Sequence, residues 1–258
     1  MDNRGRSAAP IGILCALPEE MRLFRGAVED ARTDTRGGTE VVTGLLDGAA
    51  VALADAGIGK VNAAVTAALL CDRYGCNRLV LSGVGGALDP AVAIGDVVVG
   101  TRLIQHDYGR STDAGFTPYR PGVWPFPGTT RGLGWDMSAD MEARLRAAVG
   151  TEPLPGVRVR GGDVGRAPLV HFGTILTGDA FIAGDGVRQG LVDRFGGLLV
   201  EMEGAAVAQV AERFGARWLV IRAASDLAGH DSGIDFRVFL DDAAHTAATL
   251  LRRLLPAL

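Results

Sequence analysis

The sequence is poor in the residues that build disulfide frameworks and metal sites. It contains three cysteines and four histidines in 258 residues. Cys15, Cys71 and Cys76 form no C-x-x-C pair and have no paired histidines nearby. We therefore expect reduced thiols in the protein core, with neither a disulfide framework nor a zinc site.

Long hydrophobic runs and an excess of positive charge are also missing. The first apolar run, residues 11–17, is shorter than a membrane span and ends at Pro18-Glu19-Glu20. The net charge of −4 provides no basic surface for a polyanion. These absences favour a cytoplasmic enzyme that binds a small molecule, and they argue against a membrane or a nucleic acid as the partner.

What is present is the composition of a globular protein. Hydrophobic residues make up 48% of the chain and charged residues 22%, which is enough apolar material for one large core. Residues 1–10 are mostly polar and are expected to form a flexible tail. We expect residues 11–258 to form a single domain.

Apolar runs alternate with segments of helical periodicity along most of the chain. The pattern at 40–57 predicts a hairpin that turns at Asp47-Gly48. The expected strands lie at 11–17, 78–83, 96–105, 169–178 and 217–225, and the expected helices at 60–75, 138–149, 185–195, 203–214 and 236–255. This alternation predicts an α/β fold with a central mixed sheet flanked by helices.

One long segment, residues 107–137, has no periodicity and carries aromatic residues among its glycines and prolines. A loop of this length in a compact domain usually has a function. We expect a lid or a contact between subunits, and the alternative is a surface insertion without a role.

Three acidic residues, Glu20, Glu203 and Asp226, each follow or close an apolar strand. Taken alone, each one has an ordinary structural explanation as a helix cap, a first-turn acid or a salt-bridge partner. Ligands of α/β sheets usually bind at the carboxyl ends of strands. Together, the three residues indicate a site.

Two glycine-rich stretches lie near these acids. Residues 57–60 do not form a P-loop, because Lys60 is followed by Val61, and residues 83–86 do not continue into G-x-G-x-x-G, because position 88 is leucine. Both stretches are better explained as turns that let the backbone approach a small ligand closely.

Several motifs in the same order along nearly the whole chain resemble the 5′-methylthioadenosine/S-adenosylhomocysteine nucleosidases of the nucleoside phosphorylase superfamily. Jointly they are specific, although each alone is weak. The motifs are 11-IGILCALPEEM-21, 57-GIGKVNAA-64, 82-SGVGGALDP-90, 94-IGDVVV-99, 177-TGDAFIAG-184, 200-VEMEGAAVA-208 and 222-RAASD-226.

The resemblance implies catalytic roles for three residues. Glu20 matches the base that activates water, Asp226 the acid that protonates the purine, and Arg222 a residue that assists near the water. Ser225 matches the residue that supports Asp226, and Glu203 the ligand of the ribose hydroxyls.

The resemblance also implies which residues bind the rest of a purine nucleoside, while Glu201 is less directly placed by it. The implied contacts are Met202 against the sugar, Phe181 stacked on the base, Ile182 at the base edge, Gly86 lining the pocket, and Ile58 and Phe236 against the 5′-substituent.

Hydrolysis is favoured over phosphorolysis, because Leu81 and Val84 stand where phosphorylases carry arginine and serine. Val84 and Leu17 also differ from the usual nucleosidase residues, serine and methionine, which leaves the 5′-substituent open. A purine nucleoside phosphorylase, a futalosine-type hydrolase, a hopanoid-pathway nucleoside phosphorylase and a non-catalytic nucleoside sensor are the alternatives. The resemblance further implies a homodimer that works in methionine salvage, and the chemistry requires no metal or organic cofactor.

Overall fold

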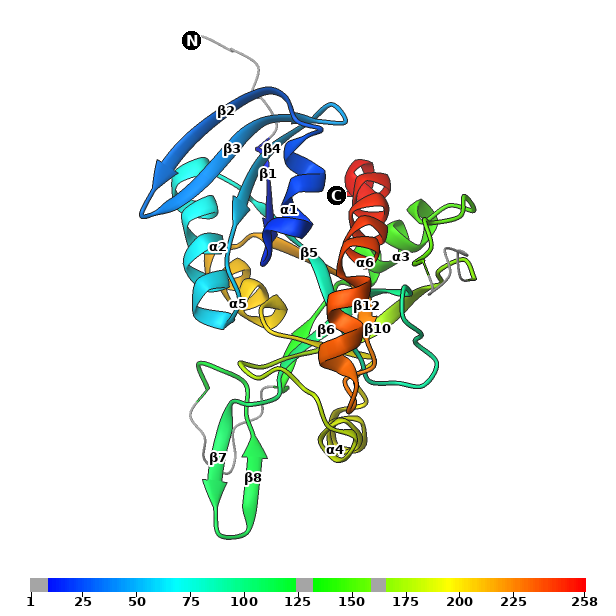
Figure 1. Cartoon of the computed structure of the whole chain (residues 1–258). Helices are drawn as coiled ribbons and strands as arrows, with labels where there is room; N and C mark the ends of the chain where they lie inside the picture. The colour runs from blue at the N-terminus through cyan, green and yellow to red at the C-terminus, as the bar shows by residue number, and fades with distance from the viewer. Residues whose placement is uncertain (1–8, 124–131, 159–165) are drawn as a thin grey trace.

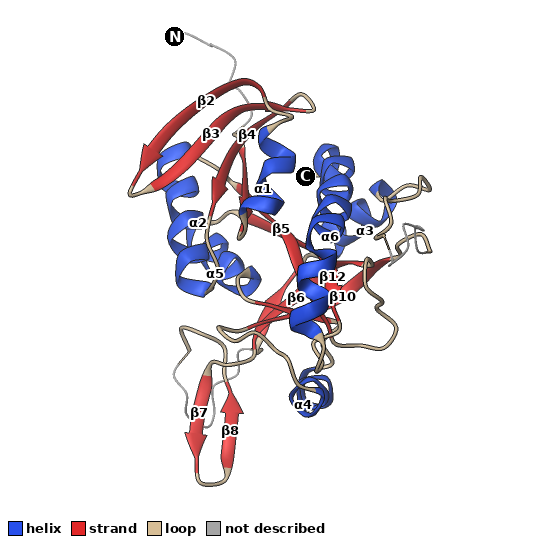
Figure 2. Cartoon of the chain, in the orientation of Figure 1, coloured by secondary structure: helices blue, strands red, loops and turns tan. Residues whose placement is uncertain are grey.

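The computed structural model describes residues 9–123, 132–158 and 166–258. In it, a large mixed sheet lies between two groups of helices (Figures 1 and 2). The helices are α1 (Pro18–Arg25), α2 (Lys60–Tyr74), α3 (Ala139–Ala148), α4 (Asp185–Phe195), α5 (Gly204–Phe214) and α6 (Ser232–Leu254), followed by the 3₁₀ turn Leu255–Ala257. Helices α2 and α5 pack together on one side, and α1, α3 and α6 lie on the other.

The main sheet runs in the order β11-β10-β6-β12-β5-β1-β4-β3-β2, and β9 pairs with β6. Its strands are β1 (Ile11–Cys15), β2 (Glu29–Arg36), β3 (Thr39–Leu46), β4 (Ala49–Asp55), β5 (Arg78–Ala87), β6 (Val97–Gln105), β9 (Gly134–Asp136), β10 (Val170–Thr177), β11 (Leu199–Glu201) and β12 (Arg217–Asp226). Strands β4, β1, β5 and β12 are parallel, as are β6, β10 and β11. The prediction of an α/β fold with a mixed sheet is confirmed.

Half of this sheet closes on itself. Strand β11, which is the first in this strand order, also pairs antiparallel with the end of β5. In this pairing Leu199 lies opposite Ala87 and Val200 opposite Gly86. Strands β5, β12, β6, β10 and β11 therefore form a closed ring. This closure brings the carboxyl ends of β5, β10, β11 and β12 to one place, and the site lies there.

The buried strands are the ones that read as continuous apolar runs in the sequence. All residues of β1 are buried, and so are nearly all of β12, because helices cover both faces of the sheet here. On one face, α2 and α5 approach the sheet closely through small side chains. These are Ala63 and Ala67 of α2 and Ala205, Ala208 and Ala211 of α5.

The predicted hairpin is confirmed, since β3 and β4 flank a turn at Asp47-Gly48. The predicted helices and strands are present, with shifted ends. The first strand stops at Cys15 instead of residue 17, because Pro18 already opens α1. The last helix begins at Ser232 instead of 236, because the polar and glycine-containing start of α6 carries no apolar periodicity.

The expectation that 107–137 lacks regular structure is wrong for the part that the structure describes. Strands β7 (Gly109–Thr112) and β8 (Gly115–Pro118) form a small hairpin that projects from the body beside α4 (Figure 1). Strand β9 joins the main sheet. Residues 124–131 of this segment, and residues 1–8 of the expected tail, lie outside the described residues.

The three cysteines are buried and free, as expected. Among the described helices, none is long and apolar enough to cross a membrane.

Candidate active site

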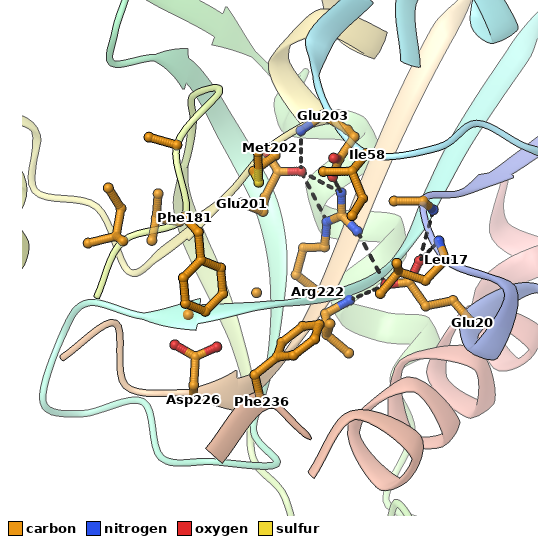
Figure 3. Close-up of a pocket in the computed structure, with 17 residues that line it drawn as sticks. Leu17, Glu20, Ile58, Phe181, Glu201, Met202, Glu203, Arg222, Asp226 and Phe236 are labelled. Atoms are coloured by element: carbon orange, nitrogen blue, oxygen red, sulfur yellow. Dashed lines mark hydrogen bonds and ion pairs between the residues drawn. The ribbon is translucent and has the colours of Figure 1, made fainter. Parts of the chain in front are cut away.

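A pocket opens at the carboxyl ends of the strands in the closed part of the sheet (Figure 3). It holds about 600 Å³ of empty space, part of it open to solvent, which suits a ligand of nucleoside size. Every residue that the sequence analysis assigned to catalysis or substrate binding lines it, except Ser225. The assigned residues in the lining are Glu20, Ile58, Gly86, Phe181, Ile182, Met202, Glu203, Arg222, Asp226 and Phe236.

Glu20 reaches the pocket from the first turn of α1. Pro18 starts this helix, and the Glu20 carboxylate bends back to accept hydrogen bonds from the N–H groups of Ala16 (2.8 Å) and Leu17 (3.0 Å). Its other oxygen accepts one from Val84 N–H (2.9 Å). Burial raises the pKa of Glu20 above its ordinary value, although Arg222 and these hydrogen bonds act to lower it. The raised pKa makes Glu20 a stronger base than an exposed glutamate.

Arg222 is the centre of the charged part of the pocket. Its side chain is 1% exposed and projects from β12 toward three glutamates. It donates to Glu201 (Nε, 3.1 Å) and to Glu203 (2.7 Å), and its third nitrogen lies 3.9 Å from Glu20. Burial acts to lower the pKa of Arg222, but the surrounding carboxylates raise it above its ordinary value, so the guanidinium stays charged.

Glu203 is the N-cap residue of α5, two residues after the end of β11. Its side chain lines the pocket. One oxygen accepts from Gly59 N–H (2.7 Å) and the other from Arg222. Burial, countered by Arg222, raises the pKa of Glu203 to about 7. The carboxylate is therefore held in place by two donors and also faces the cavity.

Glu201 was only loosely placed by the sequence analysis, and the structure gives it a definite position. It accepts hydrogen bonds from the N–H groups of Glu203 (3.0 Å) and Gly204 (2.8 Å), from the Thr177 hydroxyl, and from Arg222. It thus fixes the start of α5 and the guanidinium together. Its alternation with Glu203 was the available signal, but Thr177 and Arg222 are far away in sequence.

Asp226 lies on the opposite side of the pocket, at the end of β12 (Figure 3). Its oxygens accept from Ala228 N–H (2.9 Å) and from the Ser225 hydroxyl (3.0 Å). Among the described residues, no arginine or lysine forms an ion pair with it. Burial raises the pKa of Asp226, and the hydrogen bonds to its carboxyl group only partly oppose this. The group therefore holds a proton to higher pH than an ordinary aspartate.

Ser225, the assigned residue outside the lining, supports Asp226 from behind. Its hydroxyl lies 3.0 Å from Asp226 and 3.3 Å from the carbonyl of Gly85. Gly86 permits the close approach of β5 at this point, because a Cβ there would lie 2.8 Å from Asp226 and 3.0 Å from Ala228.

Two aromatic rings form the apolar wall between the charged groups. Phe181 and Phe236 meet edge to face, with ring centroids 5.9 Å apart. Phe181 is 50% exposed and Ile58 is 52% exposed, although both line the pocket. Apolar side chains that remain this exposed beside a cavity provide surface for a flat, uncharged ring and an apolar substituent.

The positions that distinguish phosphorolysis carry no donor side chains. Leu81 is fully buried in β5, and Val84 lines the pocket and donates its backbone N–H to Glu20. Within the described part of the lining, Arg222 is the single cation, and the lining also contains four acidic residues. No group of three or more histidine, cysteine or acidic residues in the described chain has the geometry to hold a metal ion.

The arrangement therefore places two buried carboxyl groups with raised pKa values, Asp226 and Glu20, on opposite sides of an apolar slot. Acid and base groups held on opposite sides of a ligand suit cleavage of a bond to a poor leaving group. A carboxylate beside an arginine, as in Glu203, can accept hydrogen bonds from vicinal hydroxyl groups.

Comparisons with known proteins agree with this geometry. Residues 10–256 match the family model described as the phosphorylase superfamily. The chain is 43% identical to a 5′-methylthioadenosine/S-adenosylhomocysteine nucleosidase of Mycobacterium bovis, over 97% of this chain and 98% of that one.

Solved structures with the same fold include two kinds of nucleoside hydrolase. The nucleosidase of Neisseria meningitidis in complex with methylthio-immucillin-A superimposes with a TM-score of 0.81 at 27% identity, covering 97% of this chain and 100% of that one. The futalosine hydrolase of Helicobacter pylori superimposes with a TM-score of 0.80 at 27% identity, covering 98% and 100%.

Proposed function

Since the chain belongs to the 5′-methylthioadenosine/S-adenosylhomocysteine nucleosidase family of the phosphorylase superfamily, we propose that it hydrolyses the N-glycosidic bond of a 5′-modified adenine nucleoside. The products are the free purine and a ribose derivative. The observation that carries this proposal is the pair of buried acids, Asp226 and Glu20, on opposite sides of one pocket.

Asp226 acts as the general acid. Loss of a purine is much easier when its nitrogen 7 is protonated, because the leaving group is then neutral. The raised pKa of Asp226 lets it hold a proton for this step, and Ser225 keeps the carboxyl group in orientation. Phe181 stacks on the base, and the backbone of Ile182 binds the base edge.

Glu20 acts as the general base. As the bond to the purine breaks, positive charge develops on the ribose and a water molecule attacks the anomeric carbon from the other face. Glu20 takes up the proton of this water, and Arg222, 3.9 Å from the Glu20 carboxylate, is close enough to help orient the water.

Glu203 binds the ribose hydroxyls, with Met202 packed against the sugar. Its negative charge lies near the positive charge that develops on the ribose, so the interaction strengthens in the transition state. The Gly59 N–H and Arg222 hold the carboxylate before the substrate arrives.

Water, and not phosphate, is the nucleophile. A phosphate ion would enter a cavity lined by Glu20, Glu201, Glu203 and Asp226, with Arg222 already bound to two of them. Like charges repel strongly at these short distances and in this degree of burial. The donor-free side chains of Leu81 and Val84 support the same choice.

The 5′-substituent is joined to the ribose through a thioether, whose sulfur and neighbouring carbons are apolar. Leu17, Ile58 and Phe236 give the end of the pocket away from the base an apolar lining. Several apolar side chains are more than half exposed in the single chain, among them Ile58 of the pocket lining, Val61 and Val65 of α2, and Ile234 and Val238 of α6. A homodimer would cover such surface. Methionine salvage in the cytoplasm is the setting that the family suggests.

Purine release from a panel of nucleosides tests this function. We expect 5′-methylthioadenosine and S-adenosylhomocysteine to be cleaved with higher kcat/KM than adenosine, inosine and futalosine. Preference for futalosine would assign the chain to that kind of hydrolase. Tight binding of a nucleoside without release of base would show a sensor and would contradict the proposal.

A further inference from the structure

Lys60 is the single lysine among the 26 lysine and arginine residues of the chain. It is the first residue of α2, directly after the N-cap Gly59. A positive side chain at a helix N-terminus is electrostatically unfavourable, because the helix dipole is also positive there. The chain uses arginine at every other Lys/Arg position, and lysine and arginine have similar helix propensities. Neither fact explains a lysine at this position.

The surroundings of Lys60 form a closed circuit of hydrogen bonds between three segments. The Lys60 ammonium donates to Asp107 Oδ1 (2.6 Å), just after β6. The other oxygen of Asp107 accepts from the Asp179 N–H (2.9 Å), in the loop after β10. The Asp179 carboxylate in turn accepts from the Lys60 N–H (2.8 Å) and lies 3.6 Å from the ammonium.

This circuit joins the two walls of the pocket. On one side, the turn before Lys60 carries Ile58 and the Gly59 N–H that holds Glu203. On the other side, the loop after Asp179 carries Phe181 and Ile182. The side chain of Lys60 is only 18% exposed, so its ion pairs are better shielded than those of most surface pairs.

Burial acts to raise the pKa of Asp107, but the hydrogen bonds from Lys60 and from the Asp179 N–H outweigh it, and the net pKa is lowered. The carboxylate is therefore stabilised in its charged form by this circuit. Gly59 is needed for the close approach, since it has a φ of +99° and a Cβ there would lie 3.3 Å from Asp179.

We propose that Lys60 is a positioning residue that clamps the base-binding loop 178–184 to the turn 57–60, which carries Ile58 and holds Glu203 through the Gly59 N–H. It does not touch the reacting atoms. Its effect on turnover depends on the proposed function, because a nucleoside must contact both walls while a free base contacts one. A compact ammonium with three donors can serve both aspartates at once, whereas the planar fork of arginine is longer and has fixed donor directions.

The test compares Lys60→Met with Arg252→Met, a control that breaks the Arg252–Asp47 ion pair on the far side of the molecule. In Lys60→Met we expect faster amide hydrogen exchange in 178–184 and 57–60, and a fall of kcat/KM for 5′-methylthioadenosine on the order of 10- to 10²-fold. Adenine, which needs the base wall alone, should lose much less affinity than the nucleoside. Arg252→Met should show none of these changes.

A chemical rescue separates a lost clamp from general damage. Lys60→Cys treated with 2-bromoethylamine regains an ammonium group at nearly the same position, and it should recover slow exchange and most of kcat/KM. The native thiols are protected during this reaction, because burial raises the pKa of Cys15, Cys71 and Cys76, to about 11 for Cys71 and about 12 for Cys76.

Exchange in 178–184 that is the same in Lys60→Met and the control would overturn the clamp, as would Lys60→Cys whose exchange and kcat/KM do not respond to aminoethylation. The exchange measurement needs no substrate. If the wild type released no purine, the proposed function would fail while exchange still decided the clamp.

Discussion

The sugar side and the base side of the pocket solve the problem of buried acids differently. On the sugar side, Glu20, Glu201 and Glu203 surround one guanidinium, Arg222, and each is also held by backbone N–H groups. On the base side, Asp226 is buried with two hydrogen bonds and, among the described residues, no cationic partner.

The surroundings of each carboxyl group decide how firmly it keeps its proton. A nearby cation favours the charged form of a carboxyl group, and burial without a cation favours the neutral form. Burial raises the pKa of both Glu20 and Asp226, but Arg222 opposes the rise at Glu20, while no cation among the described residues opposes it at Asp226. This difference suits Glu20 to the role of base and Asp226 to that of acid. Each prediction below changes one side of the pocket and leaves the other intact.

The largest effect is expected for Glu20→Gln. The amide cannot take up the proton of water, so turnover should fall on the order of 10³-fold or more. Both oxygens of Glu20 accept N–H groups in the wild type, so the amide NH₂ must also face a donor. Pre-steady-state turnover measures the loss of the base, and the Kd of a nucleoside measures any loss of binding that the misplaced NH₂ causes. A proportional loss of binding and turnover would make Glu20 a structural residue.

Asp226→Asn breaks the base side with less local damage. Its amide oxygen can still accept from Ala228 N–H, and its NH₂ can donate to the Ser225 hydroxyl, which rotates freely. The proton donor is lost, so kcat should fall on the order of 10²-fold or more. A melting temperature like that of the wild type would show that the fold of the variant is intact. Turnover near that of the wild type would refute the role of Asp226 as the acid.

Glu203 tests the sugar side through the substrate. A 2′-deoxy or 3′-deoxy nucleoside lacks a partner for Glu203, so the wild type should cleave it more slowly, by a charge-assisted hydrogen bond of about 1.5–3 kcal/mol. In Glu203→Gln that penalty should shrink. The comparison of kcat/KM values forms a double-mutant cycle, which separates the interaction between Glu203 and the hydroxyl from general damage to the site. An unchanged penalty would mean that another group binds the hydroxyl.

The smallest effect is expected for Ser225→Ala. The Ser225 hydrogen bond lowers the pKa of Asp226, so its removal should raise this pKa further. The acid then keeps its proton to higher pH, so the alkaline limb of the kcat/KM profile should move to higher pH. The change in kcat should stay below about tenfold. An alkaline limb that does not move would show that it reports a group other than Asp226.

The sequence predicted the site better than the contacts that hold it. Strand ends and family motifs identified the residues that line the pocket, because these depend on local order along the chain. The role of Glu201 and the Lys60 circuit were missed. Their partners, Thr177 and Arg222 for Glu201 and Asp107 and Asp179 for Lys60, lie on other strands and loops, and they come close only in the folded chain.

The fold shows the same limit. Buried strands such as β1 and β12 are visible as apolar runs. Strand β2, EDARTDTR, is exposed along its whole length at the sheet edge, so it has no apolar alternation that could predict it. The hairpin β7–β8 is similarly polar and short. Nothing in local periodicity encodes the pairing of β11 with both β10 and β5.

The choice of water over phosphate at the anomeric carbon decides which reaction this pocket catalyses. The most direct measurement is the sugar product of 5′-methylthioadenosine cleavage, identified by mass spectrometry with and without added phosphate. We expect free 5-methylthioribose, formed at the same rate in both cases. A sugar 1-phosphate, formed at a rate that rises with phosphate concentration, would contradict this expectation.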